Sequence, residues 1–437
     1  LHAAHARGAI LGDVLANLLQ FSGYYVTREY YINDAGSQIT TLSQSAFIRY
    51  REALGEALEA IPAGLYPGDY LIEVGQYLAD NYGDSLKQLS EDEIIEKIGP
   101  IAVDLMMQSI RKDLARLGIV MDIYSSENQL VKEGKVASAI QKLQSDNLIY
   151  RGKPEPPKGK LDEDWEPREQ LLFRSKDFGD DVDRPLQKSD DSWTYFASDV
   201  AYHYDKLERT DGKLIDVLGA DHSGYVKRMT AAVQAMSGKQ DRLQVKQCGL
   251  VSLLDKGKPV KMSKRAGTFV TLSDVIDAVS ADVMRFVMLT RRNDQPLEFD
   301  YAKVTEKSRE NPVFYVQYAH ARAKSVLRQN QKPSGTPNLS LLTDIFEIRV
   351  IKQLASWPKQ VEAATHHCEP HRIAFYLMEL AAVFHGLWNA GRENHDLKFI
   401  HDTDDELTHA RMLLVETTAQ VLKSGLNLLS ITAVEEM

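Results

Sequence analysis

The sequence predicts an α/β fold: a Rossmann-like parallel sheet domain with a helical insertion, followed by an all-α domain. Strand and helix patterns alternate between about residues 119 and 254, which is typical of a mostly parallel sheet covered by helices. After about Thr271 only helical patterns remain. We therefore expect a sheet domain over 1–270 with a helical insertion at about 37–117, a helical connection over 271–310 and a helical domain over 311–437.

The expected elements follow from residue spacing and from turn residues. Apolar residues three and four apart predict a helix over 6–21 that ends at Gly23, and β-forming residues predict a strand over 24–32. Pro–Gly turns break the helical stretch that comes next. Further strands are expected over 119–124, 170–173, 193–197, 214–219 and 243–254. Further helices are expected from Asp199, and over 224–236, 313–327, 341–354, 373–387 and 407–429.

Composition limits the classes of function. The net charge of −10 argues against a general nucleic-acid coat, although a local basic face remains possible. Cys248 and Cys368 lie far apart and no Cys/His cluster has ligand spacing, so neither a disulfide framework nor a metal site is expected. With no signal peptide and no apolar run of membrane-spanning length, we expect a cytoplasmic protein without a membrane partner.

Two cationic motifs predict a triphosphate site. His2 and His5 open a helix, where backbone N–H groups and the helix dipole favour phosphate oxygens. Near the middle of the chain, a Gly-Lys-Pro turn precedes a loop at about 257–268 that carries Lys261 and Lys264. Cationic and N–H donors aimed at a departing pyrophosphate lower the barrier to nucleotidyl transfer. Structural histidines and a solvated basic turn are the alternative interpretation.

The segment from Gly219 to Gly224 lies between an apolar strand and a helix, where open α/β sheets bind ligands. His222 and Gly224 are therefore candidates to approach a nucleotide base or ribose. A tight turn in which Asp221 caps the following helix explains the same residues.

Two or three polar side chains predict a site for a cation. Tyr195 and Asp199 lie four residues apart at a sheet edge, and Glu127 ends another strand. Carboxylates bind a guanidinium through bidentate, charge-assisted hydrogen bonds. The alternatives are Asp199 as a helix N-cap, Tyr195 as a core residue and Glu127 as a helix cap.

The two cationic motifs resemble the HIGH and KMSKS motifs of the class I aminoacyl-tRNA synthetases. Further strings are similar to bacterial-type arginyl-tRNA synthetases along essentially the whole chain, among them ARGAILGD, REYYINDAG, TYFASDVAYHYDK, GADHSGYVKRM and ENPVFYVQYAHAR. The resemblance implies a ligase that forms arginyl-adenylate from arginine and Mg²⁺-ATP and passes arginine to tRNA(Arg). It also implies a monomer, a class I catalytic domain and a C-terminal anticodon-binding domain of the DALR type.

The resemblance assigns roles by position. The catalytic residues are His2, His5, Lys261 and Lys264. ATP is bound by His2, His5, Gly219, Asp221, His222, Gly224, Met262, Ser263 and Lys264. Arginine is held by Tyr195, Asp199 and Glu127. The residues assigned to tRNA contacts are Tyr315, Tyr318, Trp388 and Met437. Most aromatic residues of this helical domain are equally expected in its core.

The sequence departs from the family at three places. Ala4 replaces the usual third-position Gly of HIGH, Arg265 replaces the last Ser of KMSKS, and the family's N-terminal domain and first strand are absent, so the sheet is expected to lack an inner strand. A non-catalytic tRNA-binding fragment with a defective nucleotide site is therefore the second hypothesis. A class I synthetase for another amino acid is the third, disfavoured by the Tyr195/Asp199 pair.

Overall fold

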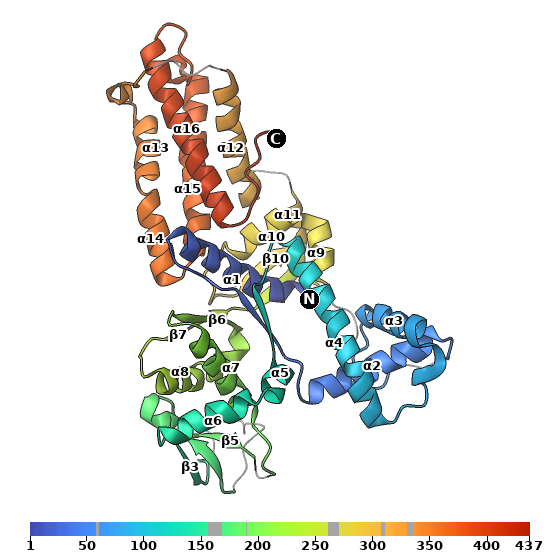
Figure 1. Cartoon of the computed structure of the whole chain (residues 1–437). Helices are drawn as coiled ribbons and strands as arrows, with labels where there is room; N and C mark the ends of the chain where they lie inside the picture. The colour runs from blue at the N-terminus through green and yellow to red at the C-terminus, as the bar shows by residue number, and fades with distance from the viewer. Residues whose placement is uncertain (58–60, 156–167, 189, 261–270, 307–310, 330–334) are drawn as a thin grey trace.

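The computed structural model describes residues 1–57, 61–155, 168–188, 190–260, 271–306, 311–329 and 335–437. Helix α1 (Ala3–Phe21) lies where three parts of the molecule meet. In Figure 1 a small helical lobe lies to its right, strands with covering helices lie below it, and a bundle of long helices rises above it. The first helix of the chain is therefore central to the architecture.

Helix α1 forms because one face is apolar and its first turn is capped. Ile10, Val14 and Leu18 are fully buried, and their spacing of four places them on the same side of the helix. His2 is the N-cap residue, and its side chain accepts the backbone N–H of His5. Gly23 follows the helix with a φ of +89°, a conformation that glycine adopts without steric cost.

The small helical lobe consists of α2 (Ser37–Ala53), α3 (Ile72–Tyr82) and α4 (Glu91–Arg116). It has a core of its own, in which Tyr50, Leu71 and Leu78 are fully buried. Ser90 and Glu93 form a capping box that fixes the start of α4. Because the lobe packs on itself, it extends from the rest of the molecule as a separate unit (Figure 1).

Three pairs of parallel strands form the α/β part. They are β1 (Glu29–Ile32) with β2 (Ile123–Ser126), β6 (Leu214–Gly219) with β7 (Leu243–Cys248), and β8 (Val251–Asp255) with β10 (Leu297–Asp300). In the described part of the chain, β1 pairs only with β2 and β6 pairs only with β7. The parallel strands therefore form separate short sheets rather than one continuous sheet.

The remaining strands are antiparallel. They are β3 (Ile149–Gly152), β4 (Gln170–Phe173) and β5 (Arg184–Gln187), which form one sheet, and β9 (Lys258–Pro259), which pairs with β8. Four helices accompany them: α5 (Glu127–Lys132), α6 (Lys135–Ser145), α7 (Tyr195–Arg209) and α8 (Ser223–Ser237). Phe173, Phe196 and Met229 lie in the core that joins these elements.

The C-terminal part is helical apart from β10. Its helices are α9 (Leu272–Val279), α10 (Ala281–Met288), α11 (Tyr301–Thr305), α12 (Pro312–Gln329), α13 (Ile345–Ala355), α14 (Trp357–His367), α15 (His371–Glu393) and α16 (Asp405–Leu428). One hydrophobic core runs from Ile10 on α1 through Phe286 on α10 to Leu380 and Leu422 in the bundle. The bundle therefore shares buried surface with the first helix.

Several expected elements differ from the structure. The expected strand over 193–197 is wrong: Thr194 caps α7 by accepting the N–H of Ala197, so the helix begins at Tyr195. Aromatic residues and threonine favour strands, but the side-chain oxygen of Thr194 provides a helix start instead. The prediction that only helices follow Thr271 is also wrong, because β10 lies beyond that residue.

The expected strand over 243–254 is two strands, β7 and β8, separated at Gly249. A side chain there would meet the backbone of Gln295, since an added Cβ would lie 2.4 Å from the carbonyl oxygen of that residue. The sequence predicted a mostly parallel sheet and did not predict the antiparallel sheet of β3, β4 and β5. Helix α14 was not expected either.

Among the described helices, α15 is long and apolar enough to cross a membrane by length and composition, and half of its most apolar window is buried inside the protein. Leu377, Leu380 and Phe384 on α15 pack in the core shared with α1 and α16.

Candidate active site

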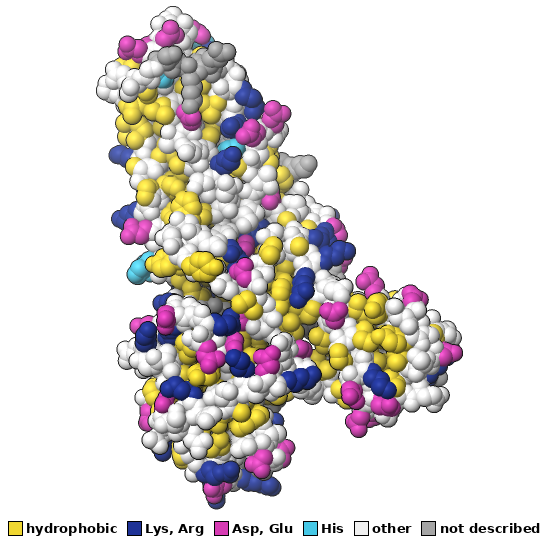
Figure 2. Space-filling view, viewed as in Figure 1, with side chains coloured by type: hydrophobic (Ala, Val, Ile, Leu, Met, Phe, Trp, Pro, Cys, Tyr) yellow, Lys and Arg dark blue, Asp and Glu magenta, His cyan; other side chains and the backbone are white. Residues whose placement is uncertain are grey.

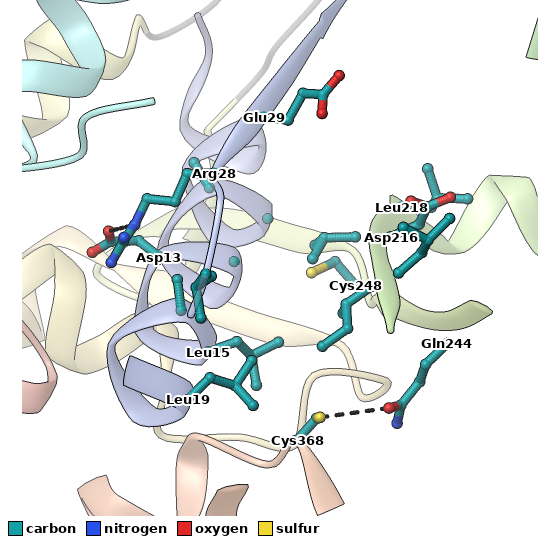
Figure 3. A pocket seen from close by; sticks show the side chains of 18 of the residues that line it. Asp13, Leu15, Leu19, Arg28, Glu29, Asp216, Leu218, Gln244, Cys248 and Cys368 are labelled. Atoms are coloured by element: carbon teal, nitrogen blue, oxygen red, sulfur yellow. Dashed lines mark hydrogen bonds and ion pairs between the residues drawn. The ribbon is translucent and has the colours of Figure 1, made fainter. Parts of the chain in front are cut away.

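A cavity of about 2040 Å³ lies beside α1 and is bounded by β1, β6 and α7. Figure 3 shows Leu15 and Leu19 of α1 on one side of it, and Asp216 and Leu218 of β6 on another. The lining includes five residues that the sequence singled out: His2, His5, Asp199, Gly219 and Asp221. Residues from the start and the middle of the chain therefore share one cavity.

The two histidines are arranged as a stacked pair at the helix start. Their ring centroids lie 3.5 Å apart, and the planes differ by 16°. The backbone N–H of each residue donates to Nδ1 of the other, at 3.4 Å. Because Nδ1 accepts, a neutral ring carries its proton on Nε2. Two Nε2–H donors and the helix N-terminus thus lie at one end of the cavity.

The described chain that follows the second cationic motif adjoins this end. Lys261, Met262, Ser263, Lys264 and Arg265 lie outside the described residues. The segment resumes at Thr271, which forms an antiparallel bridge with His2, and the N–H of Leu272 donates to the carbonyl of Leu1 at 2.9 Å. The chain that leaves the loop is therefore paired directly with the start of α1.

The turn after β6 also faces the cavity. Gly219 and Asp221 line it, whereas His222 and Gly224 lead from the turn into α8. The interpretation of Asp221 as a helix cap is wrong, because His222 occupies the N-cap position and no side chain caps the helix. His222 and Asp221 are 57% and 78% exposed, so their side chains are accessible to a ligand.

Asp199, which lines the cavity, and the nearby carboxylate of Glu127 mark another part of it, called here the carboxylate end. Glu127 is the first residue of α5 and is 5% exposed. The hydroxyls of Tyr31 and Ser198 donate to its carboxylate, while burial raises the pKa of Glu127 above its usual value. The helix-cap interpretation of Glu127 is wrong, because Ser126 accepts the N–H of Gln129 and so caps α5.

Asp199 lies within α7, not at its N-cap, so that interpretation is wrong too. Burial, together with the nearby charges of Glu127 and Asp216, raises the pKa of Asp199 to about 8. Neighbouring carboxylates that disfavour ionisation in this way favour a cation between them. This end of the cavity is therefore suited to a positively charged group.

A buried ionic cluster supports the turn of α7 that follows Asp199. His203 Nδ1 lies 2.8 Å from the carbonyl oxygen of Asp199, and Nε2 lies 2.7 Å from Oδ2 of Asp216. Lys206 donates to Oδ1 of Asp216 at 3.0 Å. Burial would raise the pKa of Asp216, but His203 and Lys206 hold it below its usual value. These contacts fix α7 against β6.

Tyr195 is 46% exposed, so the core interpretation is wrong. Its hydroxyl lies over the turn at Gly36, where an added Cβ would be 3.3 Å from that oxygen. Tyr195 is not among the residues that line the cavity. It therefore occupies a more open position than Asp199.

The structure adds three aromatic residues to the site. Tyr31, Tyr202 and Tyr225 line the cavity; the rings of Tyr31 and Tyr202 lie 4.7 Å apart, and the hydroxyl of Tyr225 is buried without a hydrogen-bond partner among the described residues. Tyr31 lies in the same β-forming run as β1, but nothing in the sequence indicates which carboxylate its hydroxyl meets.

The residues expected to contact tRNA lie on the helical bundle. Tyr318 is 36% exposed and Met437 is 61% exposed. Tyr315 and Trp388 are partly buried and pack against the shared core. The Arg322 guanidinium lies over both Tyr318 and Trp388, at 4.1 and 4.9 Å from the ring centroids. Tyr315 contacts His385, which is itself hydrogen-bonded to Arg322. Tyr315, Tyr318 and Trp388 therefore lie around one Arg322–His385 pair.

Among the described residues, no group of three or more His, Cys, Asp or Glu side chains is arranged to hold a metal ion.

Known families match both parts of the chain. The model of the class I (R) tRNA synthetase catalytic domain matches residues 1–307, and that of the DALR anticodon binding domain matches residues 316–437. The chain is 55% identical to arginine–tRNA ligases of Ruegeria pomeroyi and Xanthobacter autotrophicus. All of this chain is covered in both comparisons, with 76% and 77% of those relatives.

Solved structures agree in fold. A putative arginyl-tRNA synthetase from Campylobacter jejuni superposes with a TM-score of 0.83 at 29% identity, covering all of this chain and 91% of that one. The Thermus thermophilus arginyl-tRNA synthetase gives a TM-score of 0.77 at 21% identity, with 100% and 80% coverage. The predicted fold class, an α/β catalytic domain followed by a helical domain, is confirmed.

Proposed function

The chain belongs to the class I arginyl-tRNA synthetases, and from this membership we propose that it ligates arginine to tRNA in two steps. Arginine carboxylate attacks the α-phosphorus of ATP, which forms arginyl-adenylate and releases pyrophosphate. The 3′-terminal hydroxyl of tRNA(Arg) then attacks the arginyl carbonyl and releases AMP. No covalent enzyme intermediate is required.

One observation carries the proposal: Asp199 lines the same cavity as His2 and His5, and the buried carboxylate of Glu127 lies close enough to Asp199 to raise its pKa. A guanidinium placed between the carboxylates can bind both through paired N–H donors, and its positive charge offsets one of the two negative charges. The ammonium of lysine cannot present such a fork. The site therefore favours arginine over lysine.

The nucleotide end acts by positioning and by donating to phosphate oxygens. His2 and His5 would donate from Nε2, Gly219 and Gly224 would let the backbone approach the adenosine, and Lys261 and Lys264 would neutralise the departing pyrophosphate. Asp221, His222, Met262 and Ser263 complete the assigned ATP contacts. Mg²⁺ would enter with ATP. Ala4 adds a methyl group near this site, which reduces the space available to the nucleotide.

The helical bundle would bind the anticodon. Base stacking on exposed aromatic side chains supports a role for Tyr318 and its neighbours Tyr315 and Trp388. Met437, at the C-terminal tail, is the fourth residue assigned to tRNA. We assign the catalytic domain to 1–270, the connection to 271–310 and the anticodon-binding domain to 311–437. A cytoplasmic monomer fits the two cysteines that are both free among the described residues.

Pyrophosphate exchange tests the proposal. With arginine, tRNA(Arg) and Mg²⁺-ATP the chain should exchange labelled pyrophosphate into ATP, and lysine should not replace arginine. Lys264→Ala should lower exchange by roughly 10²-fold, the loss expected when a phosphate-stabilising group is removed. Exchange by Lys264→Ala within a few-fold of the unaltered chain would refute the role of the loop. No exchange in the unaltered chain would instead favour the non-catalytic tRNA-binding fragment.

A further inference from the structure

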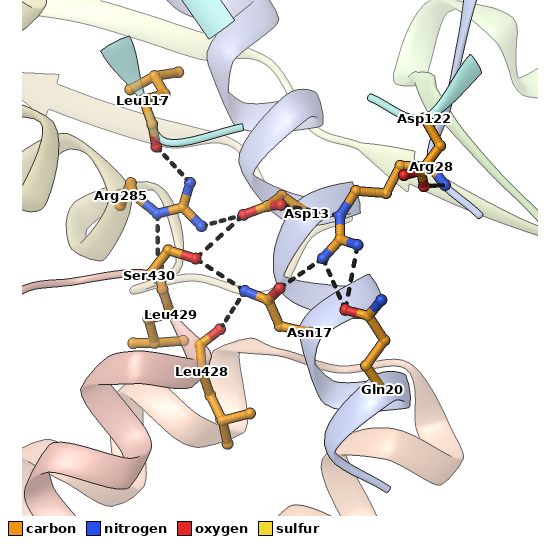
Figure 4. A network of polar contacts seen from close by, with 10 residues as sticks. All are labelled: Asp13, Asn17, Gln20, Arg28, Leu117, Asp122, Arg285, Leu428, Leu429 and Ser430. Carbon is orange, nitrogen blue, oxygen red and sulfur yellow. Dashed lines mark hydrogen bonds and ion pairs between the residues drawn. The ribbon is translucent and has the colours of Figure 1, made fainter. Parts of the chain in front are cut away.

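A buried polar network joins α1 to three other segments (Figure 4). Asp13 on α1 accepts from Nη2 of Arg285 at 2.5 Å and from Nε of Arg28 at 3.2 Å. Arg285 also donates to the carbonyls of Leu117 at 2.8 Å and Leu429 at 2.6 Å. Arg285 and Asp13 are 1% and 5% exposed in this ion pair. This ion pair is therefore almost dry, a surrounding in which hydrogen bonds and charges are strongest, whereas the contact between Asn17 and Ser430 lies at the exposed edge of the network.

The network caps the last helix of the bundle. The carbonyls at the end of α16 have no partner within the helix. Asn17 on α1 donates to the carbonyl of Leu428 at 2.9 Å, and Arg285 donates to that of Leu429. A cation at this end also complements the helix dipole. The backbone N–H groups of residues 429–431 satisfy earlier carbonyls of this end, and side chains of α1 and α10 satisfy the last two.

Ser430 follows the C-cap residue of α16, and its side chain contacts α1. It has a φ of +53°, a left-handed conformation that usually selects glycine or asparagine after a helix. Its hydroxyl accepts from Asn17 Nδ2 at 2.9 Å and lies 3.5 Å from Oδ2 of Asp13. A serine in a glycine position, with its hydroxyl on two residues of α1, indicates that this contact has a role beyond ending the helix.

We propose that Asn17 and Ser430 are positioning residues for the nucleotide site, which act through α1 on His2 and His5. Asn17 and His5 belong to one 19-residue helix whose N-cap is His2, so a shift of this helix along its axis would move Asn17 and both histidines together. The N-terminal end of α1 presents the two Nε2–H donors, and the end of the helical bundle holds its other half in place. The proposal rests on the proposed function only in assigning the histidines to ATP.

Binding of ATP to the whole chain tests the proposal by calorimetry, with no arginine present. Ser430→Gly removes the hydroxyl and at the same time suits the left-handed backbone, so Tm should not fall. The Kd for ATP should rise by roughly three- to tenfold, the range expected when one or two hydrogen bonds are lost. Asn17→Ala should raise it similarly, and the double variant should be no weaker than Asn17→Ala alone.

Ser22→Ala is the matched control. Ser22 follows the same helix and shares a 2.9 Å hydrogen bond with Thr365 of α14, so this variant also removes one contact between α1 and the bundle. It should leave the Kd for ATP unchanged. An unchanged Kd in Ser430→Gly, an equal rise in Ser22→Ala, or strictly additive effects in the double variant would each overturn the proposal.

The result also separates the inference from the proposed function. If the unaltered chain binds ATP and fails to exchange pyrophosphate with arginine, the ligase assignment fails while the Kd series still decides the inference. If exchange proceeds and Ser430→Gly binds ATP normally, only the inference fails. A chain that does not bind ATP at all overturns both.

Discussion

The two ends of the cavity are built in opposite ways. At the carboxylate end, Glu127 is 5% exposed and held by two hydroxyls, and burial raises the pKa of Asp199 to about 8. At the histidine end, His5 is exposed, the first turn of α1 provides N–H groups, and Thr271 forms a bridge with His2. One end is enclosed and charged; the other is open and rich in N–H groups.

This difference separates selection from chemistry. A buried pair of carboxylates discriminates strongly, because a substrate that leaves either of them unpaired incurs the cost of a buried charge. An open end can receive a large triphosphate and release pyrophosphate. Each donor there contributes only part of the total stabilisation of the phosphate groups. Substitutions at the carboxylate end should therefore have larger effects on arginine, and those at the histidine end should affect ATP alone.

Asp199→Asn should produce the largest effect. Removing one partner of a buried ion pair costs about 3–5 kcal/mol, which corresponds to a loss of roughly 100- to 4,000-fold in kcat/KM for arginine. The Kd for ATP should stay within about twofold. Steady-state exchange kinetics and calorimetry measure the two quantities. An equal loss in ATP affinity would show that the two ends are not separate.

The same variant should be more stable than the unaltered chain at high pH. The pKa of Asp199 is raised in the folded state, so the protonated carboxyl favours folding below about pH 4, and that contribution is lost as pH rises through about 8. Without arginine, Asp199→Asn should therefore have the higher Tm at pH 8.5 and a similar Tm at pH 4. Equal Tm values at both pH values would contradict burial of an ionised Asp199.

His5→Ala should have the next largest effect, now at the other end. Loss of one donor to the transferring phosphate should lower kcat for exchange by roughly 10- to 10²-fold. The KM for arginine and the rejection of lysine should not change. His5→Gln, whose amide keeps an N–H donor, should recover part of the rate. A variant that loses selectivity against lysine would show that the histidines also shape the arginine pocket.

The pH dependence of arginine binding should sharpen the comparison. Only ionised Asp199 pairs with a guanidinium, so the KM for arginine should fall about tenfold for each unit of pH up to about 8 and then level off. The Kd for ATP should not follow this curve. In Asp199→Asn the dependence should disappear. A KM that is flat between pH 6 and 8 would mean that Asp199 is ionised throughout that range.

Local patterns predicted the parts of the site that depend on neighbours in sequence. The apolar spacing of α1 and the β-forming run of β6 led directly to observed elements with the expected bounds or nearly so. The sequence predicted a strand where α7 begins. Thr194 acts as a helix cap only if the residues after it are helical, and their strand-forming residue types did not indicate a helix. The structural alternatives for Asp199, Glu127 and Tyr195 failed for the same reason, since caps and burial depend on the exact helix start.

Long-range contacts were beyond the sequence. The hydroxyl of Tyr31 meets Glu127 because β1 and β2 pair in parallel across the helical insertion. Likewise, nothing near Asn17 in the sequence indicates a partner at Ser430. The assignments of His2, Lys264 and Asp199 to ATP and arginine came from resemblance, and those roles stay predictions until the variants are measured.

Tyr195→Phe should give the smallest effect, and it tests where the enclosed end stops. Tyr195 is 46% exposed, and water competes for any hydrogen bond that its hydroxyl makes to arginine. Loss of the hydroxyl should raise the KM for arginine by roughly two- to fivefold, with kcat and the Kd for ATP unchanged. Tyr195→Leu, which also removes the ring over Gly36, should raise the KM further. If Tyr195→Phe instead matched the loss in Asp199→Asn, the hydroxyl would have to be enclosed when arginine binds, and the carboxylate end would close over its substrate.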